Sequence, residues 1–166
     1  MKVAIIMGSD SDFPVIEKGY NILKEFGVDV AVRVLSAHRT PDEAISFAKN
    51  AEANGYEVII GAAGKAAHLP GVLAGCTPLP VIGLPIKLSE LDGMDALLAI
   101  VQMPPGVPVA TVAINGAENA ALLAIQILSV KYEEMRAKFK NYKNEMAEKV
   151  FEKNKKLNDK LNGGLI

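Results

Sequence analysis

One polar segment, Ser36-Ala37-His38-Arg39-Thr40-Pro41, places a histidine beside an arginine directly after an apolar stretch. The planar guanidinium of Arg39 can hold a phosphate group through paired hydrogen bonds. The imidazole of His38 gains or loses a proton near neutral pH, as a general acid or base must. A histidine in this place can also cap the following helix or remain solvated. The pair therefore suggests a site for a phosphorylated ligand without establishing one.

A second segment, Gly8-Ser9-Asp10-Ser11-Asp12, also follows an apolar stretch and opens an amphipathic one. Gly8 permits a tight turn, and Ser9 and Ser11 can direct hydroxyl and amide groups toward an anion at a helix N-terminus. Asp12 can cap that helix or accept a hydrogen bond from a ribose hydroxyl. Serine and aspartate are also common at any helix start, so this segment alone is weak evidence for a ligand.

The third segment, residues 61–71, is rich in alanine and glycine and holds His68, the second of the chain's 2 histidines. Small residues let the backbone approach a ligand closely. A single histidine on an apolar helix is more often a satisfied core residue than a catalyst. His38 and His68, however, both follow candidate strands that are consecutive along the chain, and this favours one shared site.

Short apolar runs alternate with amphipathic stretches, and these elements must position the three segments. The runs are mostly continuous, as in parallel strands that are covered on both faces. Helical periodicity spans residues 13–26 and 41–54, which end at Gly27 and Gly55. Further helices are expected around 94–101 and over 119–130. The candidate strands are residues 3–7, 28–35, 57–62, 80–84 and 109–114.

This alternation predicts an α/β fold, a three-layer, doubly wound parallel sheet of the flavodoxin-like kind with a long C-terminal helix. In an open parallel sheet, ligands bind beyond the carboxyl ends of the strands, where the strand order reverses. The three polar or small-residue segments all follow candidate strands, so we expect them to meet at that edge.

From Lys131 onward the charge density rises, and apolar residues recur at steps of three and four. This narrow apolar seam on an otherwise charged helix is expected to pack against either its own domain or a neighbouring subunit. We expect a single domain over residues 1–166, with the α/β core at 1–130 and a helical extension at 131–161 near subunit contacts. The apolar seam consists of Tyr132, Met135, Phe139, Tyr142, Met146 and Val150.

Composition narrows the class of protein. The chain has 166 residues, and 50% of them are hydrophobic, as in a globular domain. Its 18 basic and 19 acidic side chains give no basic excess, so no nucleic acid partner is expected. Cys76 is the only cysteine, and we expect neither an intramolecular disulfide nor a metal site. No targeting segment and no run of about 18 apolar residues is evident, so we expect no membrane contact and a cytoplasmic location.

Together these segments resemble the signature of the N5-carboxyaminoimidazole ribonucleotide mutases. The similarity runs from Lys2 to about Val130, and five motifs in one order are specific although each alone is weak. Lys65 stands where the family usually has glycine. The matching stretches are Gly8-Ser9-x-Ser11-Asp12, Ser36-Ala37-His38-Arg39-Thr40-Pro41, Ala66-Ala67-His68-Leu69-Pro70-Gly71, residues 95–104, and residues 106–109 followed by 119–124.

The resemblance implies an isomerase of purine biosynthesis that moves a carboxyl group within one small ribonucleotide and uses no cofactor. His38 matches the family's catalytic histidine, which acts first as acid and then as base. The resemblance further implies a homo-octamer with active sites at subunit contacts, and a functional link to the ATP-dependent synthetase that makes the carbamate substrate. The positions that it assigns to substrate binding are Ser9, Ser11, Asp12, Ser36, Arg39, Gly64 and His68.

Two other functions remain open at this point. The first is direct carboxylation of aminoimidazole ribonucleotide with free carbon dioxide, as in animal-type relatives, which depart from the motif that Ala66 to Gly71 keep intact here. The second is a flavodoxin-like nucleotide-binding module without catalysis, since a fold does not determine a function. Flavin binders commonly use aromatic walls, whereas this chain has no tryptophan and 5% aromatic residues.

Overall fold

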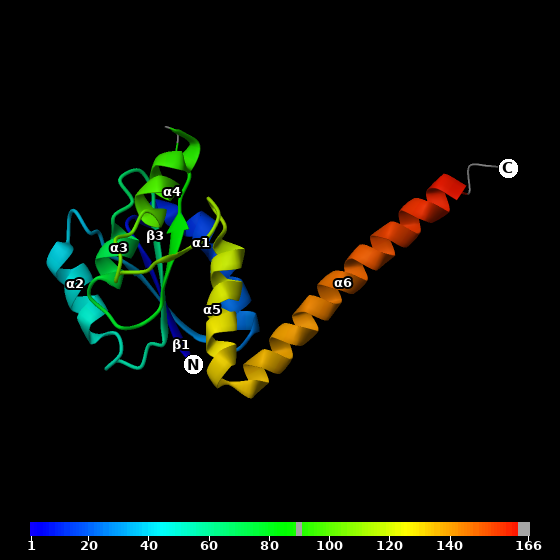
Figure 1. The fold of residues 1–166 in the computed structure, drawn as a ribbon, viewed down its shortest axis with the longest axis horizontal. Helices are drawn as coiled ribbons and strands as arrows, with labels where there is room; N and C mark the ends of the chain where they lie inside the picture. Colours follow the sequence, from blue (N-terminus) through cyan, green and yellow to red (C-terminus); the bar gives the residue numbers. More distant parts are fainter. Residues whose placement is uncertain (89–90, 163–166) are drawn as a thin grey trace.

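Parallel strands form the central sheet of this computed structural model, which describes residues 1–88 and 91–162 (Figure 1). Within this part of the chain the sheet has 5 strands, in the order β2-β1-β3-β4-β5. This is the flavodoxin-like order, and it reverses between β1 and β3. The strands are β1 (Lys2–Met7), β2 (Asp29–Val34), β3 (Val58–Ala63), β4 (Val81–Pro85) and β5 (Ala110–Thr111).

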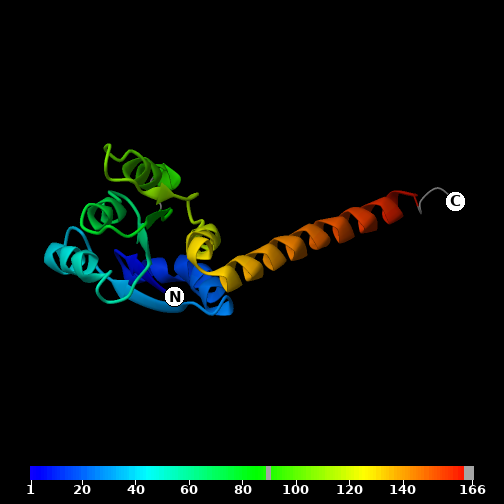
Figure 2. The same ribbon diagram turned by 60° about the horizontal axis from the view of Figure 1, so that its bottom comes forward.

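Helices cover both faces of the sheet, which confirms the predicted three-layer, doubly wound fold (Figures 1 and 2). Helices α1 and α5 pack on one face, with Val3, Ile5 and Met7 of β1 beneath them. Helices α2, α3 and α4 pack on the other, over Ala4 and Ile6, because successive strand side chains point to opposite faces. The helices are α1 (Phe13–Glu25), α2 (Pro41–Asn50), α3 (Leu69–Ala74), α4 (Met94–Val101), α5 (Ala117–Lys131) and α6 (Glu133–Asn162), with short 3-10 turns η1 (Asp10–Asp12) and η2 (Leu91–Gly93).

Two expectations about the elements are wrong in detail, and one helix was not expected. The last strand spans Ala110 and Thr111 instead of 109–114, because it lies at the sheet edge with β4 as its one neighbour in the described part of the chain, and only the Val112 amide continues the pairing, to Gly83. The predicted helix 41–54 ends at Asn50, and a turn follows up to Gly55. Helix α3 was not predicted, because it has only 6 residues and little periodicity.

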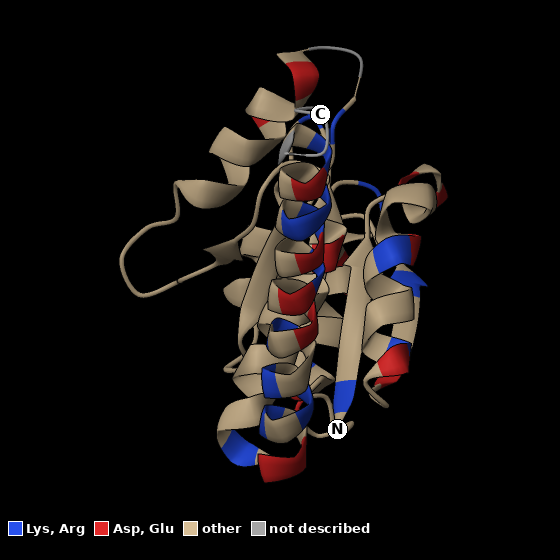
Figure 3. Ribbon diagram, turned by 90° about the vertical axis from the view of Figure 1, so that its right-hand side faces the viewer, with Lys and Arg blue, Asp and Glu red and all other residues tan. Residues whose placement is uncertain are grey.

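Helix α6 has two parts. Its first turns pack on the core, where Met135 is fully buried and Phe139 and Tyr142 are partly buried. Beyond them the helix extends away from the core with charged side chains along its length (Figures 2 and 3). Here Met146 and Val150 are exposed, at 45% and 61%. The apolar seam is therefore covered by its own chain as far as Tyr142, and its outer part, Met146 and Val150, is exposed.

Candidate active site

The parallel register brings three loops to one edge of the sheet. Met7 of β1 pairs with Val34 on one side and with Ala62 on the other, so the chain leaves β1, β2 and β3 at the same level. A cavity of about 580 Å³ lies between the loops that follow. Seven of the eight predicted site residues line this cavity, namely Ser9, Ser11, Asp12, Ser36, His38, Arg39 and Gly64.

The loop after β1 is a tight turn held by serine. The Ser9 hydroxyl oxygen accepts hydrogen bonds from the Ser11 amide at 3.3 Å and from the Ser11 hydroxyl at 2.8 Å. The amide of Gly8 donates to the carbonyl oxygen of Ala62 at 3.2 Å, which ties this loop to β3. The two hydroxyl groups therefore lie together in the cavity wall, at the start of the helical turn that leads into α1.

Asp12 is the only buried polar or charged side chain in the described part of the chain, with 5% of its surface exposed. Burial raises the pKa of its carboxyl, and this outweighs the lowering by contacts with the Ser9 backbone and the Ser11 side chain. A poorly hydrated carboxylate in a cavity wall gains from hydroxyl donors on a ligand. This fits the predicted hydrogen bond from a ribose hydroxyl.

The loop after β2 is organised by Ser36. Its hydroxyl oxygen accepts hydrogen bonds from the amides of His38 and Arg39, at 3.4 and 3.2 Å, and its own amide donates to the Thr40 hydroxyl at 2.9 Å. The Arg39 guanidinium donates to the carbonyl oxygen of Gly8 at 2.7 Å. Ser36 thus shapes the loop besides lining the cavity, and Arg39 joins this loop to the one after β1.

The loop after β3 is closely packed. A Cβ at Gly64 would lie 2.8 Å from the Leu88 side chain, so only glycine fits there without displacing a neighbour. Lys65 follows with φ of 52°, a conformation that glycine adopts more easily. Leu88 belongs to the loop after β4, and sequence reasoning missed it as a cavity residue. The rule that ligands bind at carboxyl ends of strands also points to that loop.

The structure places His68 in contact with His38, and His68 is exposed and is not among the residues that line the cavity. His38 Nε2 and His68 Nδ1 are 2.9 Å apart, and the two rings meet at 77°. One of these nitrogens donates and the other accepts, so the two tautomers are coupled. Because Nε2 of His38 is occupied, its Nδ1 is the nitrogen left for a ligand.

The cavity combines cations with an apolar wall. Arg39 and Lys65 carry positive charge, and Asp12 is the carboxyl group among the lining residues. Ala63, Ala66, Leu69 and Leu88 supply apolar surface. Within residues 1–88 and 91–162, no cluster of three or more His, Cys, Asp or Glu side chains has a geometry that could hold a metal ion. No helix in that same part of the chain is long and apolar enough to span a membrane.

The fold and this cavity define a doubly wound α/β protein with a ligand site at the point where the strand order reverses. The model of one family, described as AIR carboxylase, matches residues 2–149. The chain belongs to the AIR carboxylase family, which confirms the resemblance drawn from its motifs.

Curated relatives agree with this membership. The N5-carboxyaminoimidazole ribonucleotide mutase of Thermotoga maritima is 58% identical over 156 residues, which cover 94% of this chain and 91% of that protein. The protein of the same name from Pyrococcus horikoshii is 57% identical, covering 95% of this chain and 89% of that one. The chloroplastic phosphoribosylaminoimidazole carboxylase of Vigna aconitifolia is 50% identical, with 93% of this chain matching 28% of that protein.

A solved structure shares the architecture. The crystal structure of Treponema denticola PurE superimposes with a TM-score of 0.86 and 34% identity, covering 94% of this chain and 98% of that one. The fold is therefore that of the family over nearly the whole length of both chains.

Burial of Asp12 gives a prediction about stability. Because the folded state raises the pKa of this carboxyl, its ionised form destabilises the fold at neutral pH, and the penalty disappears as pH falls and the carboxyl becomes protonated. Asp12→Asn should therefore raise the free energy of unfolding at pH 7, and this gain should vanish in acid. Asp10→Asn makes the same charge change at an exposed neighbour and should shift stability by less than about 0.5 kcal/mol. Urea unfolding between pH 7 and pH 3 measures the free energy of unfolding of both variants. If Asp12→Asn is less stable than the parent protein at pH 7, the raised pKa of Asp12 is contradicted.

Proposed function

We propose that this chain is an isomerase of de novo purine biosynthesis that converts N5-carboxyaminoimidazole ribonucleotide to 4-carboxy-5-aminoimidazole ribonucleotide. Relatives that carry the mutase name at 58% and 57% identity support this function. The observation that carries it is that Asp12, from the segment after β1, lines the same cavity as His38 and Arg39, from the loop after β2. These are the positions at which the family's motifs place catalysis and nucleotide binding.

The proposed reaction moves one carboxyl group, and His38 first donates one proton and then recovers one. His38 protonates the exocyclic nitrogen of the substrate as the bond from that nitrogen to the carboxyl carbon breaks, which releases carbon dioxide and the free amine. The neighbouring ring carbon then attacks the carbon dioxide and forms a new carbon–carbon bond. His38 takes the proton that this ring carbon loses, so the histidine ends the cycle as it began.

The remaining cavity residues have binding roles in this proposal. Arg39 and the hydroxyls of Ser9 and Ser11 hold the phosphate, since a guanidinium and a helix start both favour an anion. Asp12 accepts hydrogen bonds from the ribose. The apolar side chains of Ala66 and Leu88 exclude water, so that released carbon dioxide stays beside the ring carbon.

An isotope experiment tests the reaction. The pure protein receives substrate labelled with heavy carbon at the carbamate, in unlabelled bicarbonate and without ATP. We expect the label to be retained in the product, since carbon dioxide does not leave the cavity. Diluted label would indicate a direct carboxylase that uses free carbon dioxide. Product that forms equally fast without protein would contradict catalysis altogether.

The two histidines differ in their expected contributions. His38→Asn should fold normally and lose at least about 100-fold in kcat, because the proton carrier is gone while the binding residues remain. His68→Phe should lose about tenfold in kcat with little change in KM, since this residue orients His38 from outside the cavity lining. His68→Asn retains a polar atom near the Nδ1 position and should recover part of the loss. Steady-state kinetics measures all three, and substantial turnover by His38→Asn would refute its assignment.

The proposal includes assembly into a homo-octamer in the cytoplasm, with a synthetase that uses ATP supplying the unstable carbamate. The feature that favours assembly is the outer part of the apolar seam, where Met146 and Val150 are exposed. The same face continues through Leu157 and Leu161, which are 54% and 63% exposed. Exposed apolar surface of this extent on a helix is typical of a subunit contact.

Charge placed on the outer seam should weaken that assembly. In Val150→Lys combined with Leu157→Lys, assembly would bury two unpaired charges, so we expect smaller species in sedimentation velocity. Glu148→Gln combined with Glu152→Gln changes the net charge equally, away from the seam, and should leave the profile unchanged. An unaltered profile for the lysine variant would show that the seam has no part in assembly.

A further inference from the structure

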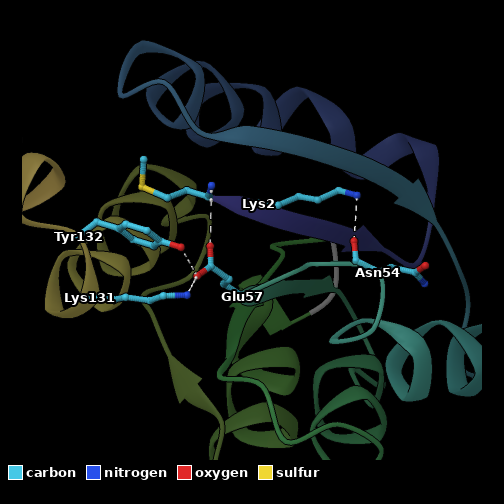
Figure 4. Close-up of polar contacts among 6 residues, drawn as sticks. Lys2, Asn54, Glu57, Lys131 and Tyr132 are labelled. Carbon is cyan, nitrogen blue, oxygen red and sulfur yellow. Dashed lines mark hydrogen bonds and ion pairs between the residues drawn. The ribbon is translucent and has the colours of Figure 1, made fainter.

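A polar cluster joins the junction of α5 and α6 to the amino end of β3, at the edge of the sheet opposite the cavity (Figure 4). Glu57 directly precedes β3, and its Oε1 accepts hydrogen bonds from Lys131 Nζ at 2.9 Å and from the Tyr132 hydroxyl at 2.8 Å. Its Oε2 lies 3.9 Å from the amino group of Met1. One carboxylate thus contacts both residues at the junction and the start of β1.

The junction itself is short. Tyr132 is the single residue between the two helices, and its backbone is extended, with φ of −109° and ψ of 108°. The Arg136 side chain donates to the carbonyl oxygens of Ser129 and Val130, both at 3.0 Å. These bonds satisfy carbonyl groups that the end of α5 leaves without a helical partner. The local backbone therefore turns sharply at one residue, whose side chain points to Glu57 (Figure 4).

The two hydrogen bonds to Glu57 are unequal. The Lys131 side chain is 69% exposed, and ion pairs of this kind in water contribute little. The Tyr132 hydroxyl lies in a partly buried environment and donates to a charged acceptor, which makes a stronger hydrogen bond. The link between the junction and the sheet therefore depends mainly on the pair of Tyr132 and Glu57.

The direction of α6 is set over a short base at its first turns, and Glu57 acts there together with apolar packing. Met135 and Phe139 pack near the junction, and Lys138 donates to the carbonyl oxygen of Phe26 at the end of α1. Beyond these first turns α6 projects away from the core (Figure 1), and Met146 and Val150 are exposed there. A small change of angle at Tyr132 moves the far end of a 30-residue helix by many ångströms.

We propose that Glu57 is a positioning residue for α6, which fixes the angle at which this helix leaves the core and so the place of the outer seam. Glu57 lies outside the cavity and takes no part in the proposed reaction. The proposal is therefore independent of the isomerase activity, and its test does not require turnover.

The ionisation of Glu57 gives the proposal a pH dependence. Burial raises the pKa of Glu57, but the hydrogen bonds from Lys131 and Tyr132 and the positive charges of Lys131 and the Met1 amine outweigh it, so the pKa is lowered. A carboxyl with a lowered pKa stabilises the folded arrangement above its ordinary pKa, and this contribution is lost as pH falls through the lowered value. The link is thus expected to hold at neutral pH and to fail in acid.

Distance measurements between spin labels test the angle. Spin labels at positions 49 on α2 and 153 on α6, in a Cys76→Ser background, report the direction of α6. An excess of unlabelled chains ensures that each measured distance joins two labels of the same chain. We expect one narrow distance distribution at pH 7 for the parent protein, and a broader one for Glu57→Gln and Tyr132→Phe. Glu52→Gln removes the same charge from an exposed side chain nearby and should leave the distribution narrow. In acid, the parent protein should resemble Glu57→Gln, since both side chains are then neutral.

Hydrogen exchange at pH 7 separates a local effect from general destabilisation. In Glu57→Gln, amides of residues 131–142 should exchange about five- to tenfold faster, as expected when one charge-assisted hydrogen bond is lost, while amides of β1 and β4 stay protected. An unchanged distance distribution in both Glu57→Gln and Tyr132→Phe would overturn the proposal. Equally faster exchange throughout the core would overturn it as well, because Glu57 would then support the whole fold and not the direction of α6.

Discussion

The pairing of β1 with both β2 and β3 is the constraint on which the cavity depends. Parallel strands in register end at the same level, and Met7 faces Val34 and Ala62 at that level. A shift of either neighbour by one residue would exchange the faces of its side chains and move its loop along the sheet. The buried apolar side chains of β1 and β3 thus determine where His38, Arg39 and Asp12 lie, although none of those three belongs to a strand.

Cross-links between loops then refine the geometry that the strands provide. Arg39 binds the carbonyl oxygen of Gly8, and His38 binds His68, so the loop after β2 is held to both of its neighbours. The burial of Asp12, in contrast, is unfavourable to the fold, since it disfavours the ionised carboxyl. A buried carboxyl with a raised pKa is common where a site is prepared for a ligand, because further hydrogen bonds from a ligand would favour its ionised form.

The sequence was informative where a local pattern controls structure and less so where distant partners decide. Continuous apolar runs located the inner strands within one or two residues, and Gly27, with φ of 82°, ends α1 as expected. The edge strand β5 was overestimated because its length depends on pairing with β4, which no local pattern records. Seven site residues were found because they follow strands. The contact of His68 with His38 depends on how two loops meet, and its motif could not distinguish a residue of the cavity wall from one that only contacts the wall.

The two edges of the sheet support different tasks. The carboxyl edge carries the cavity, whereas the amino edge carries Glu57 and the junction at Tyr132 from which α6 departs. A strand of 6 residues separates them by roughly 20 Å, beyond the distance at which salt leaves much interaction between exposed charges. Substitutions at the amino edge can therefore alter the course of α6 without changing the electrostatics around His38. If α6 reaches a neighbouring subunit, as we propose, the rigid sheet sets the position of both the cavity at one edge and the subunit contact that starts from the other.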